Sequence, residues 1–170
     1  MTLKILGALF VIAACGGLGF SIAAAHKREV RTMKRFIFAL DLMSWELEYR
    51  LTPLPELCRY VGQSGSGPVN CLFSMLAEEL ERQVSPDVAA CVHSVLSKVK
   101  YVPKLTADGF LRLGDSLGKF DVPGQLQGIA SLRSECNQML SVYTNNQDAR
   151  LRSYQTLGLC AGAALAIIFI

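Results

Sequence analysis

The stretch LGDSLGKFDVPGQLQG, residues 113–128, decides how the middle of this chain folds. Its glycines and its Gly-Lys pair would suit either a phosphate-binding loop or a bend between two helices. A G-x-x-x-x-G-K-[ST] phosphate loop follows a strand and places a hydroxyl after its lysine. Here only three residues separate Gly114 from Gly118, Phe120 stands in place of the hydroxyl, and the preceding pattern is helical. We therefore interpret the stretch as a bend between helices.

The same residues carry the signals of a helix stop and a helix restart. Gly118 suits the end of a helix, where a positive φ is favoured, and Asp121 suits the N-cap of the next helix. Three other glycines would lie inside helices, at a cost of about 1 kcal/mol each relative to alanine. We expect close helix crossings to offset this cost at Gly114, Gly124 and Gly128.

On both sides of this bend, apolar residues recur at intervals of three and four, which predicts helices. Start signals that combine a capping side chain with proline or an acid occur at Thr52-Pro53, at Ser85-Pro86-Asp87 and at Thr106-Ala107-Asp108. They divide the chain before the bend into helices at about 54–62, 69–83, 88–99 and 106–118. No segment has a convincing strand pattern. The sequence predicts an all-α fold, an antiparallel helical bundle of about six helices.

The helix before Pro53 is expected to be long, because no glycine or proline interrupts it after Gly19. Phe36, Met43 and Trp45, with Leu42, widen its apolar face, so we expect several neighbouring helices to cover that face. Glu46 lies beside the apolar stripe, whereas Glu48 points to a different face. This spacing argues against a paired acid/base site.

Both ends of the chain are apolar and uncharged, at residues 5–25 (ILGALFVIAACGGLGFSIAAA) and 154–170 (YQTLGLCAGAALAIIFI). As helices they would measure about 30 Å and about 25 Å, enough to cross a bilayer core, the second at the short limit. We predict transmembrane helices within 1–25 and at 154–170, continuous with the first and last helices of a bundle at 26–153. The alternatives are a cleaved signal peptide for the first segment and a buried soluble helix for the second.

Basic residues flank both membrane-proximal ends of the middle region, in the cluster that begins at His26 and at Arg150 and Arg152. The positive-inside tendency therefore places residues 26–153 in the cytosol. The whole chain has 17 basic and 14 acidic residues, a balance that does not favour nucleic-acid binding.

Small residues spaced by four recur in both predicted spans, at Cys15, Gly19 and Ala23 and again at Gly158 and Gly162. Such spacing lets membrane helices approach closely. We expect the two spans to pack side by side.

The residue types used in catalysis and metal binding are scattered along the chain. The six cysteines form no C-x-x-C pair, and His93 has no acidic residue near it in sequence. We expect the cysteines to be small buried side chains and the acidic run Glu78, Glu79 and Glu81 to be a solvated face. We predict no enzyme activity, no catalytic residues, no metal and no cofactor.

Two sequence motifs lie between the apolar ends of the chain. The first is E-x-x-Y-R-x-TPLPE, in which we single out Glu46, Tyr49, Thr52, Pro53, Leu54, Pro55 and Glu56. The second is LG-x-x-LG-x-x-D-x-x-GQ, with Leu113, Gly114, Leu117, Gly118, Asp121, Gly124 and Gln125. In order and in length, the whole chain resembles the stage III sporulation protein AB family.

The resemblance implies a non-enzymatic platform component of the channel that endospore-forming bacteria build between mother cell and forespore, located in the mother-cell membrane. The family's helical domain is similar to the cytoplasmic domain of platform proteins in type II secretion and type IV pilus machines. It implies a secretion-type ATPase and other channel membrane proteins as partners. Those platform proteins carry two such domains and this chain has one, so we also expect self-association. The alternative is a membrane-tethered helical adaptor or signalling bundle.

Overall fold

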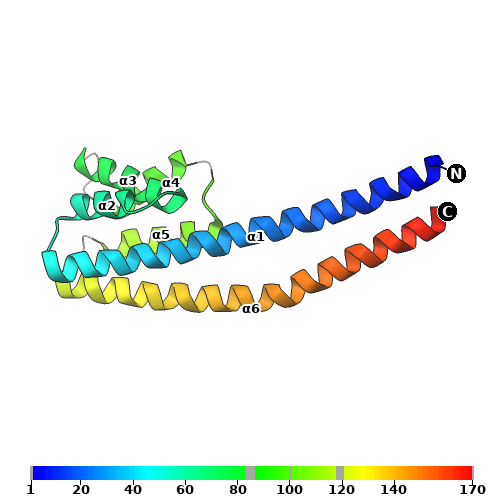
Figure 1. Cartoon of the computed structure of the whole chain (residues 1–170). Helices are drawn as coiled ribbons and strands as arrows, with labels where there is room; N and C mark the ends of the chain where they lie inside the picture. Colours follow the sequence, from blue (N-terminus) through cyan, green and yellow to red (C-terminus); the bar gives the residue numbers. More distant parts are fainter. Residues whose placement is uncertain (1, 83–86, 100, 118–120, 170) are drawn as a thin grey trace. The chain divides into compact units, whose positions relative to one another are not determined.

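The computed structural model describes the backbone of residues 2–82, 87–99, 101–117 and 121–169. It describes side chains at 21, 24–82, 87–99, 101–117 and 121–145. The elements are α1 (Thr2–Arg50), α2 (Leu54–Gln63), α3 (Pro68–Glu81), α4 (Val88–Lys98), α5 (Lys104–Ser116) and α6 (Val122–Phe169) (Figure 1). Every element in these ranges is a helix. The prediction of an all-α fold with about six helices is confirmed.

The chain divides into two compact units. One contains residues 1–28 and 141–170, the outer parts of α1 and α6, and the other contains residues 29–140. In the first unit, the His26 ring of α1 lies 4.5 Å from the Tyr143 ring of α6, measured between centroids. The second unit, called the bundle unit below, holds α2 to α5 and both sequence motifs.

Three phenylalanines from distant parts of the chain form the centre of the bundle unit. Phe36 of α1, Phe73 of α3 and Phe110 of α5 are all fully buried. The Phe73 and Phe110 rings meet edge to face, with centroids 5.3 Å apart. Phe36 lies 6.4 Å from Phe73 and 6.3 Å from Phe110. Because each ring comes from a different helix, this cluster joins α1, α3 and α5 into one core.

Two of the predicted glycines lie where one helix closely approaches another. A Cβ built on Gly114 would lie 2.9 Å from Val92 Cγ2 and 3.2 Å from Ala89 Cα, so α5 meets α4 there. At Gly128, a Cβ would lie 3.2 Å from Ser116 Cβ, where α6 meets α5. The predicted crossings at these two positions are confirmed. Gly118 lies outside the described residues.

Two further close crossings involve glycines that the sequence pattern did not single out. Gly109 of α5 faces the Phe36 ring, with 2.8 Å from its built Cβ to Phe36 Cε1. Gly62 of α2 lies against α3, with 2.9 Å from its built Cβ to the backbone nitrogen of Ser74. Both glycines are buried.

One predicted N-cap is confirmed, and those at Thr52 and Thr106 are wrong. The side chain of Asp121, the confirmed cap, accepts a hydrogen bond from the Gly124 N–H at 3.2 Å. Asp87 was expected only as the acid after a cap at Ser85, but it is itself the N-cap of α4 and accepts from the Ala89 N–H at 3.2 Å. Thr52 and Thr106 do not cap, because α2 and α5 begin directly after Pro53 and Pro103, whose φ of −56° already suits a helix start. Thr106 is instead buried inside α5. Ser85 and Pro86 lie outside the described residues.

No helix is apolar enough over a sufficient length to cross a membrane within the part of the chain whose side chains are described. Of the segments expected to span, 5–25 and 154–170, residues 5–25 have helical backbone in α1 and residues 154–169 in α6. Their side chains lie outside the described residues except at Ser21, Ala24 and Ala25. Gly19, Gly158 and Gly162 are among those left out, so the expected packing of the spans stays a prediction.

Candidate functional site

The first motif forms the junction between α1 and α2, and Glu46 is its buried centre. The Glu46 residue is only 2% exposed. Its Oε2 accepts a hydrogen bond from Thr52 Oγ1 at 3.3 Å, and its Oε1 lies 3.6 Å from the guanidinium of Arg50. Because a buried carboxylate is costly without such partners, we infer that Glu46 holds the chain after α1 in place. Thr52 therefore serves this junction rather than a helix cap.

The backbone at this junction turns sharply. Leu51 has a φ of +52°, the single positive φ outside glycine in the described residues. Such a conformation is uncommon for a branched side chain and persists where its surroundings hold it. Pro53 then begins the new direction, and its carbonyl accepts from the Leu57 N–H at 2.9 Å. The remaining motif residues, Leu54, Pro55 and Glu56, form the first turn of α2.

Aromatic side chains stand exposed at the C-terminal end of α1. Tyr49 is 68% exposed and Trp45 is 48% exposed, and their ring centroids are 5.7 Å apart. The Arg50 guanidinium lies 5.8 Å from the Trp45 ring centroid. The expectation that neighbouring helices cover Trp45 is therefore wrong. Phe36 and Met43 face the core, whereas Trp45 lies on another side of α1.

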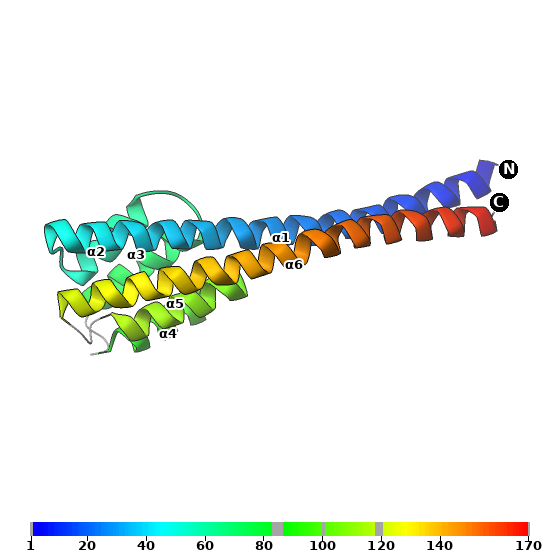
Figure 2. The same ribbon diagram turned by 90° about the horizontal axis from the view of Figure 1, so that it is seen from below.

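The second motif forms the end of α5 and the start of α6. Leu113 and Leu117 are buried in the core, and the Gln125 N–H donates to the Asp121 carbonyl at 2.9 Å in the first turn of α6. The C-terminus of α1 and the N-terminus of α6 lie at the same end of the bundle unit in both ribbon views (Figures 1 and 2). The structure thus places the two motifs at one end of this unit.

A hollow of about 210 Å³ opens beside the exposed face of α1. Its apolar walls include Phe38 and Leu42 of α1 and Val61 and Val69 of α2 and α3. The Arg35 guanidinium donates to the Ser66 carbonyl at 2.7 Å at its rim. Sequence reasoning missed this feature. The sequence signal that could have revealed it is the spacing of four and three residues between Phe38, Leu42 and Trp45, which places them on one side of a helix.

Burial makes the described core cysteines poor nucleophiles. It raises the pKa of the Cys58 thiol to about 12 and that of the Cys136 thiol to about 11, with Glu135 adding to the shift at Cys136. Burial also raises the pKa of the Cys91 thiol. Since the thiolate is the reactive form, these thiols suit packing rather than covalent catalysis.

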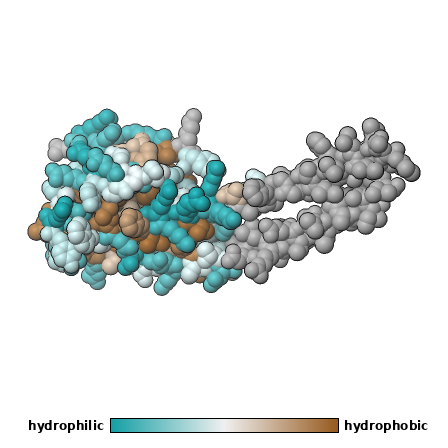
Figure 3. Space-filling model, viewed as in Figure 1, coloured by the Kyte–Doolittle hydropathy of each residue, from teal (hydrophilic) through white to brown (hydrophobic). Residues whose placement is uncertain are grey.

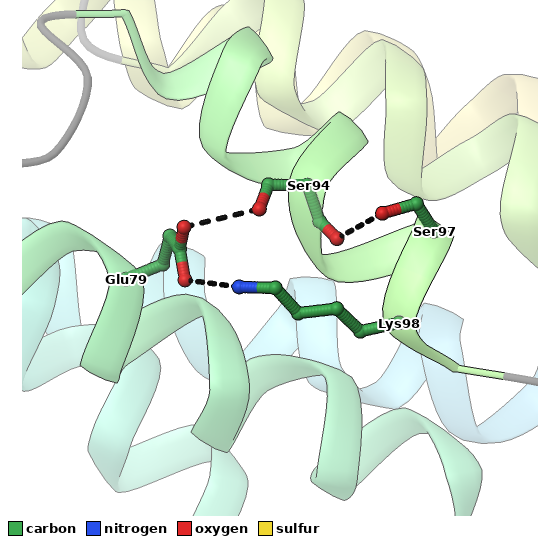
Figure 4. A network of polar contacts seen from close by, with 4 residues as sticks. All are labelled: Glu79, Ser94, Ser97 and Lys98. Carbon is green, nitrogen blue, oxygen red and sulfur yellow. Dashed lines mark hydrogen bonds and ion pairs between the residues drawn. The ribbon is translucent and has the colours of Figure 1, made fainter.

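The acidic run on α3 is only partly a solvated face. Glu79 accepts hydrogen bonds from Lys98 Nζ at 2.8 Å and from Ser94 Oγ at 3.0 Å, both on α4 (Figure 4). Glu81 pairs with Arg59 of α2, and both Glu81 and Glu78 are exposed. Two of the three carboxylates therefore join neighbouring helices.

We expect the Glu79 contacts to give the fold a pH-dependent stability. The Lys98 ammonium, followed by the Ser94 hydroxyl, lowers the pKa of Glu79 below its ordinary 4.5. A carboxyl group with a lowered pKa in the folded state stabilises that state at pH values above its ordinary pKa. This stabilisation is lost as the pH falls through the pKa of the folded state. Glu79→Gln should therefore lower the thermal midpoint of the full chain in mild detergent at neutral pH. The difference from wild type should vanish well below pH 4.5, and a difference that persisted there would contradict the ion pair as its source.

The sequence and the fold of the chain are similar to those of known proteins. Residues 4–170 match the model of the family described as stage III sporulation protein AB. The chain is 25% identical over 169 residues to the stage III sporulation protein AB of Bacillus subtilis (strain 168), and the match covers 98% of each chain. A solved structure of a stage III sporulation protein AB is similar with a TM-score of 0.61 at 19% identity, over 72% of this chain and 98% of that one, which shows a shared fold. The chain belongs to the stage III sporulation protein AB family.

Proposed function

We propose that the protein is a non-enzymatic platform subunit of the channel between mother cell and forespore. Its apolar ends would anchor it in the mother-cell membrane, and its bundle unit would lie in the mother-cell cytosol. The observation that carries this proposal is the family match over residues 4–170, which includes both apolar ends. Those ends belong to the two longest described helices, α1 and α6.

The side chains of the bundle unit support a role in binding rather than in chemistry. Its buried carboxylate, Glu46, is engaged by Thr52 and Arg50, and its core thiols have raised pKa values. Its exposed aromatic side chains on α1 offer contact surface instead. A secretion-type ATPase and other channel membrane proteins are the partners we propose, together with self-association through the spans.

The first test removes the gene from its spore-forming host and restores it as variants. Wild type, Cys58→Ala and His93→Ala should all restore the yield of heat-resistant spores, because none of these side chains performs chemistry. Normal spore formation without the gene would refute a role in sporulation. A folded, abundant His93→Ala chain that fails to restore spores would instead favour an enzyme.

The second test addresses membrane and partner. The chain should sediment with membranes of sporulating cells, and its bundle unit should be cleaved only by protease applied from the mother-cell cytosol. Detergent-solubilised chain should copurify with a secretion-type ATPase. Recovery in the soluble fraction would contradict the anchor, and purification without any ATPase would contradict the proposed partner.

A further inference from the structure

One face of α1 in the bundle unit carries a row of apolar side chains that no helix covers among the described residues. We call Phe38, Leu42, Trp45 and Tyr49 the α1 stripe. Phe38 is 64% exposed, Trp45 48% and Tyr49 68%, and Leu42 is half-buried. Their spacing of four, three and four keeps them on one side of a helix over about 16 Å. Brown apolar patches interrupt the teal surface of this unit in Figure 3.

The α1 stripe leads into the hollow described above. Phe38 and Leu42 line that hollow together with Val61 and Val69. Its volume of about 210 Å³ is far above the roughly 10–15 Å³ that one water needs, so a large apolar side chain fits. Exposed apolar residues scattered singly need no explanation, but a continuous row beside a hollow that has apolar and polar walls indicates a binding surface.

The charges around the α1 stripe are mainly positive. Arg31, Lys34 and Arg35 are exposed at its N-terminal end, and Arg50, which is paired with Glu46, lies beside Trp45 at the other. Asp41 pairs with Arg133 of α6 at 2.5 Å, which neutralises its charge. Glu48 adds one exposed carboxylate on a flank. An occupant of this surface therefore gains most if it carries acidic residues.

A second copy of the chain fits this charge pattern poorly. A parallel pair of α1 helices would place Arg31 and Lys34 against the same residues of the other copy. In an antiparallel pair that matches Phe38 with Tyr49, Arg50 of one copy would come within about one helical turn of the other copy's Lys34. Both arrangements oppose like charges, which disfavours association.

We propose that the α1 stripe and its hollow bind an amphipathic helix of another protein, with apolar residues at intervals of three and four and acidic residues on its flanks. The apolar side chains of that helix pack on Trp45 and Tyr49 and enter the hollow beside Phe38. Its carboxylates meet Arg31 and Lys34. This surface deepens the proposed function and rests on it, since it names the chemistry of one platform partner.

The test places a photoreactive amino acid, p-benzoylphenylalanine, at Phe38 or Trp45 of the full chain in sporulating cells. Tyr101, which is 82% exposed and lies outside the stripe, is the matched control position. Illumination should yield a product at both stripe positions and little at position 101, and mass spectrometry identifies the attached peptide. An acidic amphipathic helix of another protein supports the proposal. A peptide from a second copy, a lipid, a basic segment, or no product above the control overturns it.

Charge reversal provides the second arm. Arg31→Glu with Lys34→Glu should lower the cross-link at Trp45 by about tenfold or more, because two attractive contacts become repulsive. Arg31→Lys with Lys34→Arg keeps both charges and should retain the product. Equal products from both pairs would overturn the acidic partner. Spore yield measured on the same strains distinguishes failure of the proposed function from failure of the proposed surface. Spores that form without the chain refute the proposed function. The cross-link reports on the α1 stripe in either case.

Discussion

Replacing Phe73 with alanine is expected to lower the free energy of unfolding by about 3–5 kcal/mol. The Phe73 ring is fully buried and meets the Phe110 ring edge to face at 5.3 Å. Its removal leaves a cavity where α1, α3 and α5 meet. The loss therefore includes the transfer energy of the ring and the contacts of the side chains that surrounded it. Denaturant unfolding of the full chain in mild detergent, followed by far-ultraviolet circular dichroism, measures it.

Phe38→Ala is the matched control for this prediction, because it removes the same ring from a position that is 64% exposed. We expect it to change the free energy of unfolding by no more than about 0.5 kcal/mol. Similar losses for the two variants would contradict the assignment of Phe73 to the core and of Phe38 to a surface. The pair thus also tests whether the α1 stripe is free of a structural role.

Local sequence signals predicted the elements of the bundle unit well. A capping carboxylate depends on residues close together in the chain, so Asp121 was assigned correctly. The errors at Thr52 and Thr106 arose where two local signals compete. Proline at the N-cap needs no side-chain partner, which left Thr52 free to contact Glu46.

Contacts between helices were harder to predict, because the pattern of one helix does not say which neighbour it meets. Gly114 was predicted to lie at a helix crossing because glycine is costly inside a helix, and its crossing with α4 is confirmed. Gly62 looked like an ordinary helix end, and Gly109 had no distinguishing neighbour in the sequence. Their contacts with Ser74 and Phe36 depend on residues far along the chain.

The sequence also predicted the residues of the candidate surface only in part. Glu46 was placed beside the apolar stripe of its helix, and its neighbours in the fold then explain its burial. Trp45 was assigned to a covered face because α1 is apolar on two sides. Hydrophobic periodicity alone predicts burial for both of these sides of α1. Only the packing of α3 and α5 on the side of Phe36 identifies the other side as exposed.

The second large effect is expected for Gly62→Ala, which should lower the free energy of unfolding by about 1–3 kcal/mol or more. The new methyl group would lie 2.9 Å from Ser74 N and 3.1 Å from Ser74 Cα, and closer still to its hydroxyl. A side chain can rotate away, but backbone atoms of α3 can move only with their helix. This strain should exceed the gain of about 1 kcal/mol that alanine normally brings to a helix interior. Denaturant unfolding of the full chain gives the value.

Two further variants test whether the backbone of α3 is the obstacle at Gly62. Gly65→Ala is the matched control, because the atoms nearest to its methyl group would belong to the side chain of Asn70, at 3.3 Å, and we expect a change within about 0.5 kcal/mol. Adding Ser74→Ala to Gly62→Ala removes the hydroxyl and leaves the backbone in place. The double variant should therefore recover only part of the loss. Full recovery would show that α2 and α3 are separated enough for a side chain at position 62, and that the hydroxyl of Ser74 alone had excluded it.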